Sequence, residues 1–315
     1  MKTLFGLLQK LSLIAFLFGT LIITAQETPE IIGRWDLEVQ DGDKWLPAWL
    51  EVKQSGSKAL VGHFVGVSGS ARPISEVYFK DNLINFSIPP QWSGTHYLHV
   101  TGTVNQDAME GNLIDPYGIS HVFRGVRAPG LLTPEPAKWS KPRSLLKENV
   151  TDGWTTPPGS VANQWFVKDG ILTSPASGAN LMTEEEFMDF KLHIEFKYPE
   201  GSNSGVYLRG RYEVQVEDSY GKEPSSVYLG GVYGFVTPNE NVAKKAGEWQ
   251  TYDITLVGRR VTVVANGKTI ISRQIIPGIT GGALNSKEGE PGPILLQGDH
   301  GPVEYRNITI ATPEK

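Results

Sequence analysis

The chain has 315 residues, with 35 glycines, 21 prolines, no cysteine and a formal net charge of −5 at pH 7. No run of basic residues is present to follow a phosphate backbone, which argues against nucleic acid as a partner. The lack of cysteine excludes disulfides, thiolate metal sites and a lipid-anchored cysteine. Many turn-forming residues without long helical periodicity predict an all-β protein, and the length allows two domains.

Residues 1–25 are predicted to be a secretory signal peptide. Lys2 and Lys10 are basic, residues 11–25 are mostly apolar, and a polar segment begins at Gln26. The apolar stretch is shorter than a typical membrane-spanning helix. The sequence therefore predicts a periplasmic or secreted protein with no membrane association after signal removal. Its oligomeric state is left open.

Residues 30–129 are predicted to form a small all-β domain. Short alternating stretches such as "GRWDLEV", "ALVGHFVGV" and "HYLHVTGTV" are separated by turn signals, of which Asp41-Gly42-Asp43 is one. Strands of this length predict an antiparallel barrel or sandwich. Residues 130–143, "GLLTPEPAKWSKPR", contain three prolines and little periodicity, which indicates a linker.

Residues 144–311 are predicted to form a second β-domain. "QWFVKDGILTS" indicates two strands around a tight turn, and Asn266-Gly267 is the strongest hairpin signal of the chain. Ten or more strands over this range predict a sandwich of two sheets. Residues 183–186 fit a capping box, which predicts one short helix before the strand at Phe190.

The segment 203–221, "NSGVYLRGRYEVQVEDSYG", has an unusual number of hydrogen-bonding side chains at every second position. Glu213, Gln215 and Glu217 fall on one face of a strand, with neighbours roughly 6.5–7 Å apart. Two interpretations are open. The face is either simply solvated, with cross-strand ion pairs, or it is a floor on which a polar ligand binds.

Several blocks of this second region resemble the family of 3-keto-disaccharide hydrolase domains. They are "NSGVYLRG" at 203–210, "YEVQV" at 212–216 with Asp218, "GEWQTY" at 247–252, "NG" at 266–267, "LQGDHG" at 296–301 and "EYRNI" at 304–308. The resemblance implies a concanavalin-like jelly-roll sandwich over 144–311, and a turn or bulge between Gly210 and Tyr212. It also implies action on sugars oxidised to a ketone at C3, with cleavage by elimination or net hydrolysis. The predicted partner is thus an oxidised sugar or glycoside.

The chemistry of such a substrate defines which residues are needed. A C3 ketone acidifies the proton on C2, and its removal gives an enediolate that can expel the group at C1. The site requires a general base, an acid for the leaving oxygen and a donor or cation at the C3 oxygen. We predict Glu213 and His300 as base and acid, in an order that is left open, and Arg209 as the cation.

Further polar residues of the matching blocks are predicted to bind or orient the sugar. They are Asn203, Gln215, Glu217, Gln297, Asp299 and Glu304. Asp299 can in addition raise the basicity of His300 if it hydrogen-bonds the imidazole. No ligand spacing identifies a metal site, although a divalent metal is compatible with a site built from these residue types.

Two other functions are compatible with the same residues. Sandwiches of this class include lectins, so a non-catalytic carbohydrate-binding protein is one alternative. The other is an ordinary glycosidase in which Glu213 and Glu217 act as paired carboxylates on an unoxidised substrate.

Overall fold

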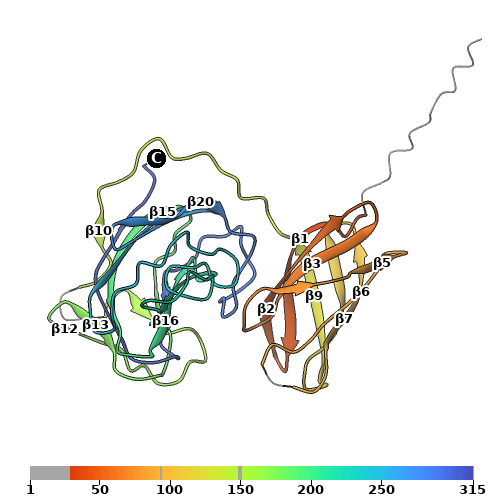
Figure 1. The fold of residues 1–315 in the computed structure, drawn as a ribbon, viewed down its shortest axis with the longest axis horizontal. Coiled ribbons are helices and arrows are strands. Elements are labelled where there is room, and N and C mark those ends of the chain that lie inside the picture. Colours follow the sequence, from red (N-terminus) through yellow and green to blue (C-terminus); the bar gives the residue numbers. More distant parts are fainter. Residues whose placement is uncertain (1–28, 93, 148–150, 315) are drawn as a thin grey trace, which may run out of the picture.

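The protein is described by a computed structural model that covers residues 29–92, 94–147 and 151–314. These residues form two all-β units that lie side by side (Figure 1). The signal peptide predicted for residues 1–25 lies outside the described residues. Over the described ranges, no helix is long and apolar enough to cross a membrane.

The first unit is one antiparallel sheet of nine strands that curls into a barrel. The sheet order is β4-β3-β2-β1-β9-β8-β7-β6-β5, so the first and last strands pair in its middle. The edge strand β4 also approaches β6, which brings the two ends of the sheet together. The strands are β1 (Gly33–Asp41), β2 (Lys44–Ser55), β3 (Ala59–Val65), β4 (Arg72–Ile74), β5 (Tyr78–Lys80), β6 (Leu83–Ile88), β7 (Leu98–Asn105), β8 (Ala108–Ile114) and β9 (Ser120–Arg127).

The second unit is the predicted two-sheet sandwich, a jelly-roll-like fold. One sheet has the order β12-β13-β22-β15-β18-β19-β20, with β10 paired to β22, and the other has the order β11-β14-β21-β16-β17. The strands are β10 (Arg143–Ser144), β11 (Trp154–Thr155), β12 (Phe166–Lys168), β13 (Ile171–Ser174), β14 (Leu181–Thr183), β15 (Phe190–Lys197), β16 (Asn203–Leu208), β17 (Tyr212–Glu217), β18 (Gln250–Val257), β19 (Arg260–Ala265), β20 (Lys268–Ile275), β21 (Leu295–Leu296) and β22 (Val303–Ala311).

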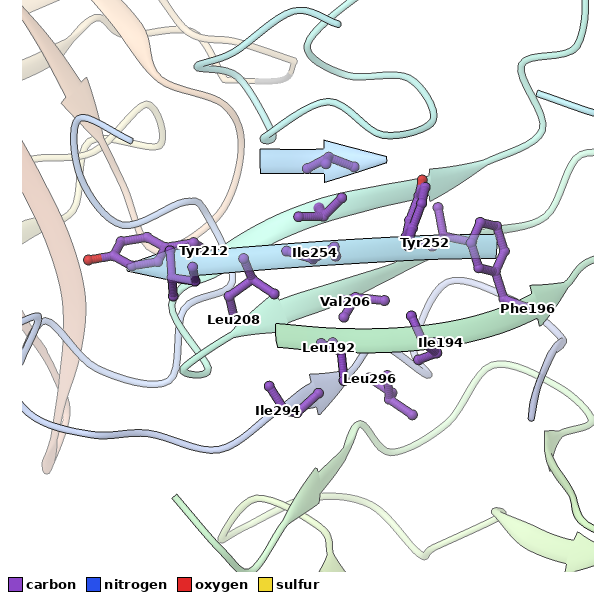
Figure 2. Packing of buried hydrophobic residues seen from close by; sticks show 14 of the residues in the cluster. Leu192, Ile194, Phe196, Val206, Leu208, Tyr212, Tyr252, Ile254, Ile294 and Leu296 are labelled. Atoms are coloured by element: carbon purple, nitrogen blue, oxygen red, sulfur yellow. The ribbon is translucent and has the colours of Figure 1, made fainter. Parts of the chain in front are cut away.

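The core of the sandwich lies between these two sheets and is built by simple alternation. Leu192, Ile194 and Phe196 point inward from β15, and Val206 and Leu208 meet them from β16 (Figure 2). All five are at most 1% exposed. Each such side chain contributes roughly 1.5–3 kcal/mol by leaving water. Alternation on β16 therefore commits every other residue of that strand to the opposite, outer face.

The prediction of a short helix at residues 183–186 is wrong. Thr183 is the last residue of β14, where it pairs with Trp154, and the Glu184 backbone N–H donates to the Gly153 carbonyl at 2.9 Å. The Thr183 hydroxyl does bond locally, but to the Glu185 carbonyl at 2.6 Å rather than to a helical N–H. The neighbouring sheet thus satisfies the backbone groups that a capping box would have served.

The barrel is docked onto the sandwich through buried side chains. Trp49 of β2 is fully buried in the hydrophobic cluster of the second unit, where its ring meets Phe235 edge-on at 5.4 Å between centroids. The Ser286 hydroxyl donates to the Leu37 carbonyl of β1. The segment 130–143, predicted as a linker, also contacts the sandwich, since the Arg259 N–H donates to the Leu131 carbonyl at 2.9 Å. The barrel and the sandwich therefore share buried contacts.

A buried ionic cluster lies at the same interface. Arg259 binds Glu288 through two hydrogen bonds of 2.6 and 2.7 Å, and both side chains are fully buried. Arg259 also donates to the Pro129 carbonyl at 2.9 Å. Asp36 of the barrel joins this cluster, and burial together with the Glu288 charge raises the pKa of Asp36 to about 9. At neutral pH Asp36 is therefore protonated and donates to Glu288.

Replacing Asp36 by asparagine should stabilise the protein at pH 8. Because the pKa of Asp36 is higher in the folded state, its contribution to stability is lost as pH rises from about 4 toward 9. Asparagine keeps a donor for Glu288 and cannot ionise. We expect the free energy of unfolding at pH 8 to rise by at least about 1 kcal/mol, since one pKa unit corresponds to about 1.4 kcal/mol. Denaturant unfolding at pH 5 and pH 8 would measure it, with Asp41→Asn, exposed on the same strand, as the control. Equal pH dependence in Asp36→Asn and the parent would contradict the prediction.

Candidate active site

A hollow of about 200 Å³ opens on the outer face of β16 and β17, where the barrel meets the sandwich. It is smaller than the roughly 300–1,000 Å³ of most drug-sized ligand pockets. Its size suits a single ring better than a long oligosaccharide. The lining residues are Ser68, Gly69 and Trp92 from the barrel, and Asn180, Asn203, Tyr207, Glu213, Gln215, Tyr233, Gly281, Gly282, Gln297, Asp299 and His300 from the sandwich.

The hairpin of β16 and β17 positions the floor of this hollow. The register pairs Tyr207 with Glu213 and Gly205 with Gln215, so these residues share the outer face. The chain reverses at residues 209–211, which confirms the turn predicted between Gly210 and Tyr212. The polar floor is covered by other segments, since the Gly281 carbonyl oxygen lies 3.0 Å from the Tyr207 hydroxyl and Tyr233 also lines the hollow. Tyr207, Glu213 and Gln215 are consequently at most 3% exposed.

The Glu213 carboxyl is strongly perturbed by its burial in the hollow. Burial raises the pKa of Glu213 to about 8, against the opposing effects of the Tyr207 hydrogen bond and the His300 charge. The Tyr207 hydroxyl lies 3.0 Å from Glu213 Oε2 and 3.0 Å from the Gly281 carbonyl oxygen. A hydroxyl has only one proton to donate, so both contacts are satisfied when Glu213 carries a proton of its own. Geometry and pKa thus agree on a protonated Glu213 at neutral pH.

The Gln215 amide supports the other oxygen of this carboxyl. In the orientation that satisfies both amide atoms, Gln215 Nε2 donates to Glu213 Oε1 at 2.9 Å and to the Ser204 carbonyl at 3.2 Å. The Glu213 backbone is fixed as well, since its N–H donates to the Thr280 hydroxyl at 3.0 Å. Glu213 is therefore held in one orientation before any substrate arrives.

Gly205 makes room for Glu213, and replacing it should damage the site. A Cβ on Gly205 would lie 2.9 Å from Glu213 Cγ and closer still to the carboxyl oxygen. We expect Gly205→Ala to displace the carboxyl and to lower the cleavage rate of a 3-keto-glycoside by at least about tenfold, because misplaced catalytic groups lose activity steeply. Steady-state kinetics would test this, with Gly130→Ala, where a Cβ meets nothing and φ is not positive, as a control for folding. Full activity in Gly205→Ala would contradict it.

His300 and Asp299 form a pair at the mouth of the hollow. His300 Nδ1 lies 2.7 Å from Asp299 Oδ1, so these adjacent side chains do reach one another, as the sequence analysis required for this role. The Asp299 hydrogen bond raises the pKa of His300 above its ordinary value, although partial burial opposes the shift. Side-chain exposures of 52% and 49% leave both groups accessible to a ligand. The pair leaves Nε2 of His300 as the ring nitrogen available for proton transfer.

Two predicted amides line the same hollow. Gln297 is 8% exposed, and its Oε1 is buried with no hydrogen-bond partner among the described residues. A buried acceptor without a partner is costly, and a ligand hydroxyl would satisfy it. Asn203 lies at the start of β16 and also lines the hollow. The structure therefore brings together Asn203, Glu213, Gln215, Gln297, Asp299 and His300.

The structure places the other predicted residues elsewhere. Arg209 is fully buried in the hairpin turn and donates to the Gly258 carbonyl at 2.7 Å and the Tyr212 hydroxyl at 3.2 Å. These bonds direct it toward β18, so it is not the cation of this hollow. Glu304 pairs with Lys197 at 2.5 Å on β22. Glu217 lies at the end of β17 and pairs with Lys222 at 3.7 Å. None of the three lines the hollow.

Five lining side chains were missed in the sequence analysis. Tyr207 and Tyr233 are hydroxyl donors, Asn180 is a further amide, and Ser68 and Trp92 come from the barrel. The sequence contained a signal for Tyr207, because it lies four residues after Asn203 on the same strand and therefore on the same face. No local pattern distinguishes Tyr233, Asn180 or Trp92, because loops from distant parts of the chain bring them to the site. Over the described ranges, no three His, Cys, Asp or Glu side chains are arranged to hold a metal ion.

Comparison with protein families decides the class of this site. Residues 141–311, more than half of the chain, match the model of the 3-keto-alpha-glucoside-1,2-lyase-like domain. The chain belongs to this family. It is therefore a carbohydrate-active protein, and the matched range contains every lining residue of the hollow except Ser68, Gly69 and Trp92. No curated protein matches the chain.

Two solved structures are similar to the part of the chain that contains the family domain. A candidate glycosyl hydrolase from Parabacteroides distasonis ATCC 8503 is 29% identical, with a TM-score of 0.47, and the match covers 56% of this chain and 92% of that one. A second candidate glycosyl hydrolase from the same organism is 25% identical, with a TM-score of 0.43, and the match covers 54% of this chain and 98% of that one.

Proposed function

We propose that the protein is an exported enzyme that cleaves the glycosidic bond of 3-keto-glycosides. The observation that carries this proposal is the pairing, in one hollow, of a buried and protonated Glu213 with an accessible His300–Asp299 pair. A protonated carboxyl is an acid at neutral pH, and an imidazole oriented by a carboxylate is a base. Family membership supports the choice of a 3-keto sugar.

In the proposed reaction, neutral His300 removes the proton from C2 of the sugar. The electron pair forms the C1–C2 double bond as the C1–O bond breaks, and Glu213 gives its proton to the leaving oxygen. The products are an unsaturated 3-keto sugar and the free alcohol, and addition of water at C1 would give net hydrolysis. His300 gains one proton in the reaction and Glu213 loses one, so the net number of protons on the enzyme is unchanged. One proton transfer from His300 to Glu213, direct or through solvent, restores the starting state.

Since Arg209 lies elsewhere, neutral donors remain for the negative charge that develops at the C3 oxygen. Asn203 and Tyr233 line the hollow with an amide and a hydroxyl. Preorganised neutral donors stabilise an oxyanion effectively where water is excluded. The unpartnered Gln297 oxygen would accept from a sugar hydroxyl and thereby fix the ring.

Product analysis by mass spectrometry tests the proposal. We expect the protein to cleave 3-keto-trehalose and to leave trehalose intact, because only the ketone acidifies C2. An unsaturated product would establish elimination. Cleavage of trehalose itself would contradict the proposal and favour a glycosidase, and binding of both sugars without cleavage would favour a carbohydrate-binding protein.

A further inference from the structure

The barrel has a cavity of its own, of about 380 Å³, at the end that faces the sandwich. Its walls are mainly apolar and include Leu46, Phe64, Ile88, Leu98 and Leu113. The volume and the mixture of apolar walls with a few polar groups are typical of small-molecule sites.

The wall of this cavity carries charged groups of both signs. Arg72 donates to the Pro89 carbonyl at 2.7 Å. His121 Nε2 lies 3.3 Å from Asp115 Oδ2, and its Nδ1 lies 3.0 Å from the Gln40 carbonyl oxygen. Asp41 is the remaining titratable acid on the wall. Because the two carboxylates outnumber the single guanidinium, the cavity does not attract an anion, and its mainly apolar walls suit an uncharged occupant.

The cavity adjoins the candidate active site. Ser68 and Trp92 line both hollows. Trp92 is 70% exposed, which is unusual for so large an apolar ring. Its ring packs over Gly69, where a Cβ would lie 3.0 Å from the Trp92 Cη2 atom. A flat aromatic face thus stands at the boundary between the two hollows.

The boundary lies on the side of the hollow that contains the proposed acid. The Tyr207 hydroxyl contacts both Glu213 and the Gly281 carbonyl, each at 3.0 Å. Gly281 is packed against the barrel residue Gly69 so closely that a Cβ would strike the Gly69 backbone. The adjacent Gly282 N–H donates to the Val67 carbonyl of the barrel at 3.0 Å. A leaving group protonated by Glu213 therefore departs toward the barrel.

We propose that the barrel cavity is the subsite for the leaving group, and that this group is an uncharged, ring-bearing aglycone that stacks on Trp92. The inference deepens the proposed function and rests on it for the direction in which the aglycone leaves. A sugar ring fills the smaller hollow on β16 and β17, and an aromatic alcohol fills the larger, apolar one. The preferred substrate is then a 3-keto-glucoside of an aromatic or polycyclic alcohol, which should be cleaved faster than one whose leaving group is a second sugar.

Binding of two unoxidised probes to the full chain tests the subsite without chemistry. We expect 2-naphthyl α-glucoside to bind at least about tenfold more tightly than methyl α-glucoside, as measured by titration calorimetry. Trp92→Ala and Tyr117→Ala, which alter the boundary and the cavity wall respectively, should each remove most of this ratio. Tyr78→Ala is the matched control, since Tyr78 is an aromatic of the barrel with similar exposure and does not line the cavity. An unchanged ratio in both cavity variants would overturn the proposal.

Turnover separates this inference from the proposed function. If the 3-keto forms of both probes are cleaved, the ratio of their kcat/KM values should fall in Trp92→Ala together with the binding ratio. If neither is cleaved, the proposed function fails while the binding ratio still decides the subsite. Undiminished binding of free 2-naphthol in the presence of saturating methyl α-glucoside, with no gain for the joined molecule, would show an independent barrel site and would also overturn the proposal.

Discussion

Replacing Glu213 by glutamine should lower the rate of 3-keto-glycoside cleavage at least about hundredfold, and it should also make the protein more stable at pH 8. The loss of rate follows because glutamine has no proton to give to the leaving oxygen, and general acid catalysis contributes roughly 10²–10⁴-fold. Glutamine matches the carboxyl in shape and can still bond to Tyr207. The substitution therefore removes the chemistry and leaves the packing in place.

The gain in stability follows from the sign of the pKa shift. Burial raises the pKa of Glu213 from 4.5 to about 8, so the folded state retains a proton that the unfolded state has lost. Stability contributed by this group is fully present below pH 4.5 and declines as pH rises toward 8. Each pKa unit corresponds to about 1.4 kcal/mol, so the free energy of unfolding falls by a few kcal/mol between these two pH values. Glutamine does not ionise and should therefore flatten this decline.

Denaturant unfolding at pH 5 and pH 8, with kinetics on the same preparations, would measure both effects. Glu217→Gln is the control for activity, because Glu217 lies two residues away on β17 and does not line the hollow. Its rate should stay within about threefold of the parent, a range that corresponds to less than 1 kcal/mol. Equal losses in Glu213→Gln and Glu217→Gln would instead favour a paired-carboxylate glycosidase. A Glu213→Gln variant with reduced stability at pH 8 would refute the assignment of a buried, protonated acid.

The sequence predicted those parts of the site that depend on one hairpin. Alternation along residues 212–217 assigns Glu213, Gln215 and Glu217 to one face, and the period-two geometry of strands makes this assignment independent of the rest of the fold. Gly205 was a further signal, since a glycine inside a strand often marks a close approach. The same alternation could not reveal that this face is covered, because its cover comes from residues 233 and 280–282.

Arg209 shows why the remaining roles could not be predicted. Alternation alone would place it with Tyr207, but the chain turns at that residue, where φ is +54°. Its guanidinium then bonds to the Gly258 carbonyl, some fifty residues away. Trp92 likewise owes its position to the docking of the barrel, which depends on Trp49 entering the core of the sandwich. Such long-range contacts leave no local pattern in the chain.

Replacing His300 by asparagine should also lower the rate at least about hundredfold, and the pH profile should reveal why. In the proposed mechanism kcat/KM needs neutral His300 and protonated Glu213, so it should form a bell. The acid limb reports His300, whose pKa is raised by the Asp299 hydrogen bond. The alkaline limb falls near pH 8, where Glu213 loses its proton.

Asp299→Asn should move both limbs of this bell to lower pH. The variant loses the hydrogen bond and charge that raise the pKa of His300, and it loses the negative charge that adds to the raised pKa of Glu213. Asp253→Asn is a matched control, because Asp253 bonds His193 Nδ1 at the same 2.7 Å on the surface of β18. That variant should leave the profile unchanged. The mirrored assignment, with Glu213 as base and His300 as acid, needs the same number of bound protons and therefore gives a bell of the same shape. A 3-keto-glucoside of 4-nitrophenol decides between the two, because so good a leaving group needs no acid. Glu213→Gln should recover most of its rate on this substrate and His300→Asn should not, whereas recovery in His300→Asn alone would make Glu213 the residue that takes the proton from C2.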